Sequence, residues 1–226
     1  MTHTTLAAAA AARAQNVRQR ADRPSQRRSA EQAGSRATVR AALSGVQVRD
    51  ADDGTTMEFR GHASVYEAGY EMWDMFGPYT EIVSEGAGRD SLARADLDVP
   101  LVLGHDQLRR MARTTTGTLI LTEDATGLSV YAPVLDPTDY DVAYIAPKLR
   151  AGLVDEMSFA FRIEAGQWSP DYTEYRINRY DIHRGDVAIV GYGANPNTVG
   201  SLRQPAAAAP ANSRARALLE LAIAGD

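Results

Sequence analysis

The sequence contains no cysteine, a single lysine (Lys148) and no long apolar run. The absence of cysteine excludes disulfide bonds, thiolate metal sites and cysteine nucleophiles. Since no apolar run approaches the roughly 18–20 residues needed to cross a bilayer, we expect no membrane-spanning segment. Aromatic residues make up only 7%, yet 44% of the 226 residues are hydrophobic and 23% are charged. This composition is typical of a globular protein with one domain and appendages, or with two small domains.

Positive charge is concentrated near the N-terminus and is almost entirely arginine. Residues 1–40 contain eight arginines against Asp22 and Glu31, a balance of +6. Because the net charge of the whole chain is −5, residues 41–226 carry a charge of −11. Because residues 41–226 are acidic, they are not expected to attract the phosphate backbone of a nucleic acid. A nucleic-acid-binding function would therefore depend on the basic N-terminal segment alone.

The composition divides the chain into three parts. Residues 1–45, rich in Ala and Arg, are expected to form a flexible basic arm, because a helix over Leu6–Arg20 lacks an apolar stripe to bury. The arginines follow a run of alanines rather than precede a strongly apolar stretch, which excludes a secretory signal. Residues 46–203 are expected to form the compact domain, and residues 204–226 a Pro/Ala linker with a short C-terminal helix.

Alternating apolar and polar residues predict a mainly β (α+β) fold. Met57–Val65 alternates with a period of two, which is typical of a half-buried strand. Similar strand-like runs lie at Tyr79–Ser84, Val99–Gly104, Gly117–Thr122, Leu128–Leu135, Met157–Glu164, Thr173–Ile182 and Val187–Val190. Helices are expected at Gly88–Ala95 and Thr138–Gly152. Many short strands with two helices favour a closed antiparallel barrel of about seven strands with flanking helices.

The common nucleotide, zinc and hydrolase motifs are absent: there is no GxGxxG, GxxxxGK[ST], HExxH or GxSxG. Four scattered histidines do not form an obvious zinc site, so we expect neither a metal nor a cofactor. His3 lies in the arm, and His62 and His183 are expected at the surface. His105 ends the buried-strand run VPLVLGHD, a position suited either to a general base or to an ordinary hydrogen-bonded histidine at a strand end.

Two further residues could complete a nucleophilic site with His105. In VDEMSFAFRIE, Ser158 lies on the strand face opposite Met157 and Phe159, beside a small alanine that would allow a substrate to approach. A serine hydroxyl needs an imidazole nearby to accept its proton. Asp186, after Gly185, could orient that imidazole, or it could simply cap a turn.

These segments together resemble the prohead proteases of tailed phages with the HK97-type capsid. The resemblance runs from about Phe59 to Arg203 and rests on FRGHASVYE, VPLVLGHD, ARTTTGTLILTEDATGLSVYAPVLD, EMSFAF and GDVAIVGYGANPNT, in this order. It implies a fold related to the herpesvirus assembly proteases, with Ser158 as nucleophile, His105 as base and Asp186 as acid. Relatives often have glutamate followed by Val-Ser where this chain has Asp-Val-Ala, and a glycine where it has Ala112.

The function implied by the resemblance is that of a serine endopeptidase that cleaves the major capsid protein and the scaffold protein inside the procapsid, in the bacterial host cytoplasm. Self-cleavage in the linker-like segments Arg20–Gly34 and Gln204–Ser213 would fit this function, and a homo-oligomer fits by analogy with the herpesvirus enzymes. A catalytically inactive assembly scaffold that binds capsid protein is the alternative interpretation.

Overall fold

The computed structural model describes residues 4–25, 27–29, 47–50 and 55–191. Within these ranges the protein is mainly β, as the sequence predicts, and it has three α-helices. The expected linker and helix at residues 204–226 lie outside the described residues. No helix in the described part of the chain is long and apolar enough to cross a membrane.

The larger sheet has seven strands and is organised around one long strand, β11 (Glu174–Val190). β10 (Glu156–Trp168) pairs with β11 antiparallel along one edge. Along the other edge, β5 (Pro78–Val83) and then β6 (Pro100–Leu103) pair with it in parallel. The order β1-β4-β5-β11-β6-β7 is completed by β1 (Arg28–Ser29), β4 (Tyr70–Trp73) and β7 (Arg110–Arg113).

The smaller sheet has the order β2-β3-β9-β8, with antiparallel neighbours throughout. Its strands are β2 (Gln47–Asp50), β3 (Met57–Val65), β8 (Ile120–Glu123) and β9 (Gly127–Leu135). β3 buries alternate residues as its sequence predicts, including Met57 and Phe59. The main hydrophobic core draws side chains from both sheets and from α3 (Tyr140–Arg150), where Asp139 caps the first turn.

The prediction of a closed barrel is wrong, because the described strands form two open sheets. The alternating pattern identifies which residues face the core, but it does not specify which strand pairs with which. β11 pairs with two strands in succession along one edge, which extends the larger sheet lengthwise, and no ladder between the two sheets closes it in the described part of the chain. The expected strands at Thr173–Ile182 and Val187–Val190 are both parts of β11.

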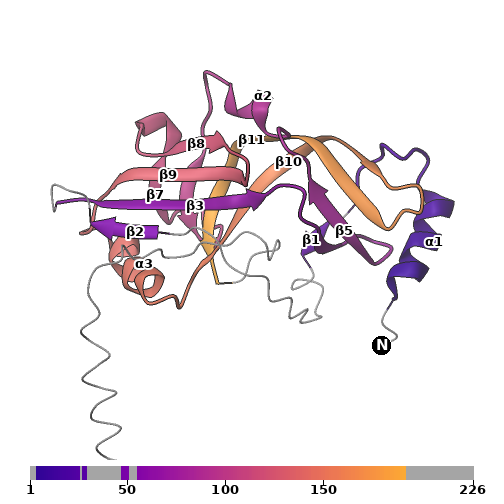
Figure 1. Cartoon of the computed structure of the whole chain (residues 1–226), viewed down its shortest axis with the longest axis horizontal. Helices are drawn as coiled ribbons and strands as arrows, with labels where there is room; N and C mark the ends of the chain where they lie inside the picture. The colour runs from indigo at the N-terminus through magenta and orange to yellow at the C-terminus, as the bar shows by residue number, and fades with distance from the viewer. Residues whose placement is uncertain (1–3, 26, 30–46, 51–54, 192–226) are drawn as a thin grey trace, which may run out of the picture.

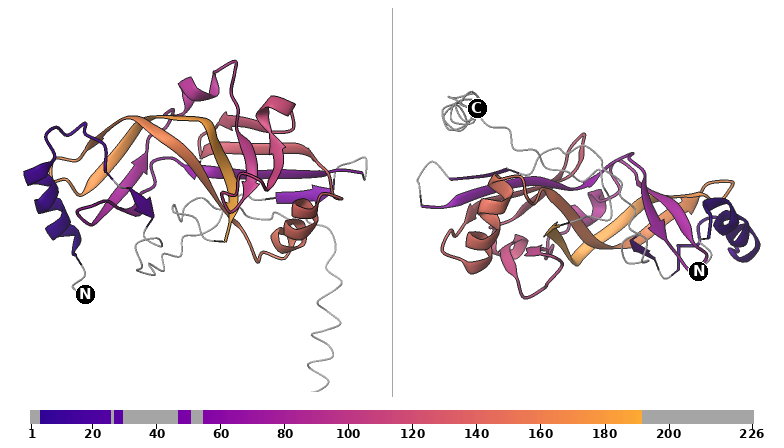
Figure 2. Two further views of the ribbon diagram at one scale, coloured as in Figure 1. Left: turned by 180° about the vertical axis from the view of Figure 1, so that it is seen from behind. Right: turned by 90° about the horizontal axis from the view of Figure 1, so that it is seen from below.

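The N-terminal residues 4–25 and 27–29, here called the strap, pack along the end of the molecule opposite α3 (Figures 1 and 2). The strap contains α1 (Leu6–Asn16), which buries Ala9, Ala10 and Arg13. Arg13 is 0% exposed and forms an ion pair with Asp74 at 2.8 Å. Its guanidinium carbon lies 5.2 Å from the ring centre of Tyr79 and 5.0 Å from that of Trp168.

The rest of the strap is also bonded to the body. The Arg20 backbone carbonyl accepts the Trp168 backbone N–H at 2.7 Å, and Arg23 donates to the Ile163 carbonyl at 2.7 Å. Arg27 donates to both carboxylate oxygens of the fully buried Glu81. This docking is not evident from the sequence, because the strap has no apolar stripe and is held mainly by arginines.

Candidate active site

His105 is positioned by a sharp turn at the end of β6. The four residues of β6 are all buried, and the chain then passes through Gly104 with φ 61° and His105 with φ 60°. A left-handed conformation is uncommon for a residue other than glycine and is often found at functional sites. The Gly104 N–H donates to the Ile189 carbonyl at 2.9 Å, which fixes this turn beside the end of β11.

Asp186 is positioned by a bulge in β11. Ala160 of β10 lies opposite Asp186 and Arg162 opposite Asp181, so one residue of β10 spans four residues of β11, 182–185. Arg184 within the bulge has φ 58°. A Cβ on Gly185 would lie 1.8 Å from the Ala160 carbonyl oxygen, so only glycine allows the two strands to approach this closely. The bulge ends at Asp186 and therefore decides where its carboxylate points.

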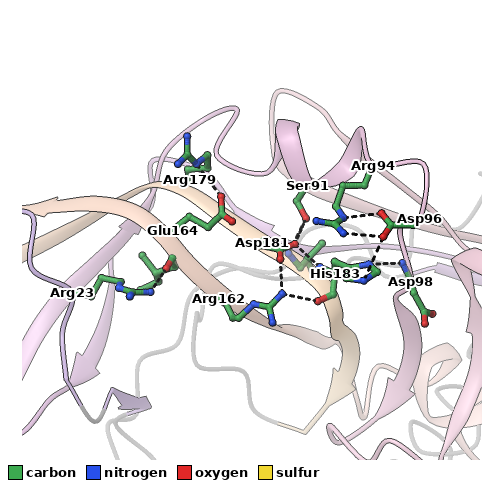
Figure 3. A network of polar contacts seen from close by, with 12 residues as sticks. Arg23, Ser91, Arg94, Asp96, Asp98, Arg162, Glu164, Arg179, Asp181 and His183 are labelled. Atoms are coloured by element: carbon green, nitrogen blue, oxygen red, sulfur yellow. Dashed lines mark hydrogen bonds and ion pairs between the residues drawn. The ribbon is translucent and has the colours of Figure 1, made fainter.

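A polar network around the buried Asp181 holds the other end of this bulge (Figure 3). The Asp181 carboxylate accepts the Ser91 hydroxyl at 2.8 Å, the His183 backbone N–H at 2.9 Å and Arg162 at 2.6 Å. Ser91, in the short helix α2 (Arg89–Leu92), in turn accepts the Ile182 N–H at 2.9 Å. Burial alone would raise the pKa of Asp181, but these hydrogen bonds, led by that of Arg162, lower it to about 2. The Asp181 carboxylate that holds this end of the bulge is therefore ionised across the neutral pH range.

The turn and the bulge bring His105 and Asp186 into contact, although they are far apart in sequence. The two residues are joined by a 2.6 Å hydrogen bond between His105 Nδ1 and Asp186 Oδ1. The Asp186 side chain is 3% exposed and the His105 side chain 39%. A buried carboxylate thus holds one ring nitrogen and, with Nδ1 donating, leaves Nε2 as an acceptor on an accessible imidazole.

Ser158 shares one face of the sheet with Asp186. Ser158 lies directly opposite Ala188, and Ala160 opposite Asp186, in the β10–β11 ladder. Opposite residues, and residues two apart on one strand, point to the same side of a sheet. The same face carries the small apolar cluster of Val102, Ala188 and Val190, whereas Met157 and Phe159 face the main core.

The register also relates His105 to Ser158. His105 follows Gly104, which is bonded to Ile189, yet its ring reaches Asp186. Ala188 lies between Asp186 and Ile189 along β11, and Ser158 is the β10 residue opposite it. The structure joins His105 to Asp186, but no hydrogen bond links the Ser158 hydroxyl to His105 among the described residues.

One residue at this site was missed by the sequence analysis. Gln107 Nε2 donates to Asp186 Oδ2 at 2.6 Å, so each carboxylate oxygen has a partner. Gln107 lies two positions after His105 in the same turn. This spacing is the only feature of the sequence that could have identified Gln107 as part of the site. The described residues contain no group of three or more His, Asp or Glu side chains suited to a metal ion.

The other two histidines of the domain take part in different contacts. His62 Nε2 bonds Asp124 Oδ2 at 2.7 Å, and His183 Nδ1 accepts the Asp98 N–H at 3.3 Å. Neither is joined to a serine hydroxyl in the part of the chain that the structure describes.

Comparison with known proteins identifies one family. The family model described as caudovirus prohead serine protease matches residues 44–209. In searches of curated proteins and of solved structures, nothing matches the chain.

Proposed function

The chain belongs to the family of caudovirus prohead serine proteases, and from this premise we propose that Ser158, His105 and Asp186 form its catalytic triad. A family member of this kind is a capsid-maturation protease that acts within the phage procapsid. The observation that carries the proposal is the contact between the accessible imidazole of His105 and the buried carboxylate of Asp186. A surface histidine with no functional role has no need of a carboxylate removed from water, because burying that charge is costly unless it is paired.

In the proposed reaction, Ser158 Oγ attacks the carbonyl carbon of the scissile peptide bond while His105 Nε2 accepts the hydroxyl proton. The resulting imidazolium is stabilised by Asp186 through Nδ1. Nε2 then returns the proton to the leaving nitrogen, the C–N bond breaks, and an acyl-serine remains. Water, deprotonated by the same nitrogen, releases the new carboxyl end and regenerates the serine.

The proposed substrates are the major capsid protein and the scaffold protein, met inside the procapsid in the cytoplasm of the bacterial host. Self-cleavage is also proposed, but the strap restricts where it occurs. Residues 20–29 include three arginines bonded to the body, Arg20, Arg23 and Arg27. Since a protease needs an extended, detached segment, cleavage within residues 20–29 is expected only after the strap has been released.

The test is co-expression with the phage's major capsid protein, followed by intact-mass spectrometry of both chains. Wild type is compared with Ser158→Ala and with Ser129→Ala as a matched control. Ser129, like Ser158, is a half-buried serine within a strand, but it belongs to the smaller sheet. We expect wild type and Ser129→Ala to remove a defined capsid segment and Ser158→Ala to remove none.

Two other outcomes would change the proposal. Equal trimming by all three proteins would exclude Ser158 as the nucleophile. No trimming by any of them, with particles still forming, would favour an inactive assembly scaffold.

A further inference from the structure

The Asp186 carboxylate is held at both oxygens by one short turn. Oδ1 bonds His105 Nδ1 and Oδ2 accepts from Gln107 Nε2, each at 2.6 Å. Both partners lie in the turn that follows β6. An aspartate held at one oxygen alone can rotate about its terminal bond, whereas one held at both oxygens has a fixed plane.

The turn that carries both partners is itself well bonded. The Asp106 N–H donates to the Leu103 carbonyl at 3.0 Å, and the Arg109 N–H donates to the Asp106 carbonyl at 3.0 Å. The Asp106 carboxylate also accepts the Leu108 N–H at 2.9 Å. The separation between the imidazole and the amide is therefore set by local backbone structure.

The orientation of the Gln107 amide is fixed by Arg110. Arg110 Nη2 donates to Gln107 Oε1 at 3.3 Å, and Arg110 Nε donates to the Gln107 backbone carbonyl at 2.7 Å. Because an arginine can only donate, the amide oxygen must face it and the NH₂ group must face Asp186. An amide turned the other way would place its oxygen against the Asp186 carboxylate, acceptor against acceptor, and its NH₂ group against Arg110, donor against donor.

We propose that Gln107 is a positioning residue for the proteolytic reaction: it holds the carboxylate plane of Asp186 so that Asp186 can orient His105. This inference rests on the proposed catalytic roles of His105 and Asp186. Gln107 does not touch the reacting atoms. Its removal lowers the rate of the chemical step and leaves substrate binding unchanged.

The test compares Gln107→Met with Gln167→Met, since methionine keeps the length of glutamine without its donor. Gln167 is an exposed glutamine in β10 and serves as the matched control. Because Gln107 is itself exposed, both variants are expected to fold, but Gln107→Met should melt below Gln167→Met, since one oxygen of the buried Asp186 loses its hydrogen bond. For peptide cleavage, we expect kcat of Gln107→Met to fall about 10–100-fold with KM unchanged, the usual cost of a lost hydrogen bond to a charged group.

A second readout does not depend on proteolysis. In the inactive Ser158→Ala background, the His105 Nδ1 proton in its short hydrogen bond should give a far-downfield proton NMR resonance, assigned by its loss in His105→Gln. We expect Gln107→Met to shift or broaden this resonance, and Gln167→Met to leave it unchanged. An unaltered resonance together with full kcat in Gln107→Met would overturn the inference. If the wild type cleaves no substrate, the proposed function fails, but the resonance still decides whether Gln107 holds Asp186.

Discussion

Replacing Arg13 by methionine is expected to destabilise the protein severely, although the sequence around Arg13 shows no apolar stripe. Its guanidinium donates to both carboxylate oxygens of Asp74, at 2.8 and 2.9 Å, and to the carbonyls of Gly77, Pro78 and Tyr172. The Asp74 side chain is only 1% exposed. Methionine would fill the space between the aromatic rings but leave a buried carboxylate without its cation. Breaking one partner of a buried pair costs about 3–5 kcal/mol.

In a chain of this size, that loss corresponds to a fall in melting temperature of about 6–20 °C. The assay is thermal unfolding followed by circular dichroism, with Arg18→Met as the control, because Arg18 is an exposed arginine of the same strap. The double variant Arg13→Met/Asp74→Asn should recover part of the loss, since it removes the unpaired charge. If Arg13→Met and Arg18→Met have the same melting temperature, the ion pair does not hold the strap and the reasoning is refuted.

Two further predictions concern the bulge that aims Asp186. Gly185→Ala should reduce cleavage by about 100-fold, the usual cost of displacing a catalytic group by an ångström, because its Cβ would overlap the Ala160 carbonyl. Gly117→Ala, which meets open space at φ 72°, should cost only about 1 kcal/mol of stability and no activity. Asp181, whose pKa is lowered from 3.8 to about 2, stabilises the fold above its ordinary pKa, and this contribution is lost as pH falls toward 2. The advantage of wild type over Asp181→Asn in urea unfolding should therefore be about 2 kcal/mol near neutral pH and shrink between about pH 4 and pH 2; a constant difference would contradict this assignment.

Much of the secondary structure could be predicted from periodicity alone. The alternation in Met57–Val65 coincides with β3, and the spacing of Val142, Ile145 and Leu149 marks the buried face of α3. The sheet connectivity could not be predicted, because residues that alternate correctly will satisfy either a closed barrel or open sheets. The decisive feature, the parallel pairing of β11 with both β5 and β6, depends on contacts between residues that lie 86 to 94 positions apart in the chain.

The candidate site could be predicted only in part. The residues alone left Asp186 either to orient the imidazole of His105 or to cap a turn, and only the family resemblance favoured the first of these. The contact depends on a bulge whose signal in sequence is a single glycine, Gly185. Gln107 gave less signal still, since a polar residue in a turn needs no special explanation. Arg13 was missed for a related reason, because hydropathy counts arginine as polar and takes no account of carbonyls and rings that can surround it.

The place of β11 in the chain has a consequence for biosynthesis. β11 lies at the middle of the larger sheet, yet it is the last strand in the described part of the chain. β5 and β6 leave the ribosome much earlier than β11, so they cannot pair with β11 until it has been synthesised. The strap, which precedes β10 in the chain, must likewise wait for Trp168 before it can dock. The contact between His105 and Asp186 therefore forms only after β11 has left the ribosome, so a chain terminated before β11 carries no assembled His–Asp pair.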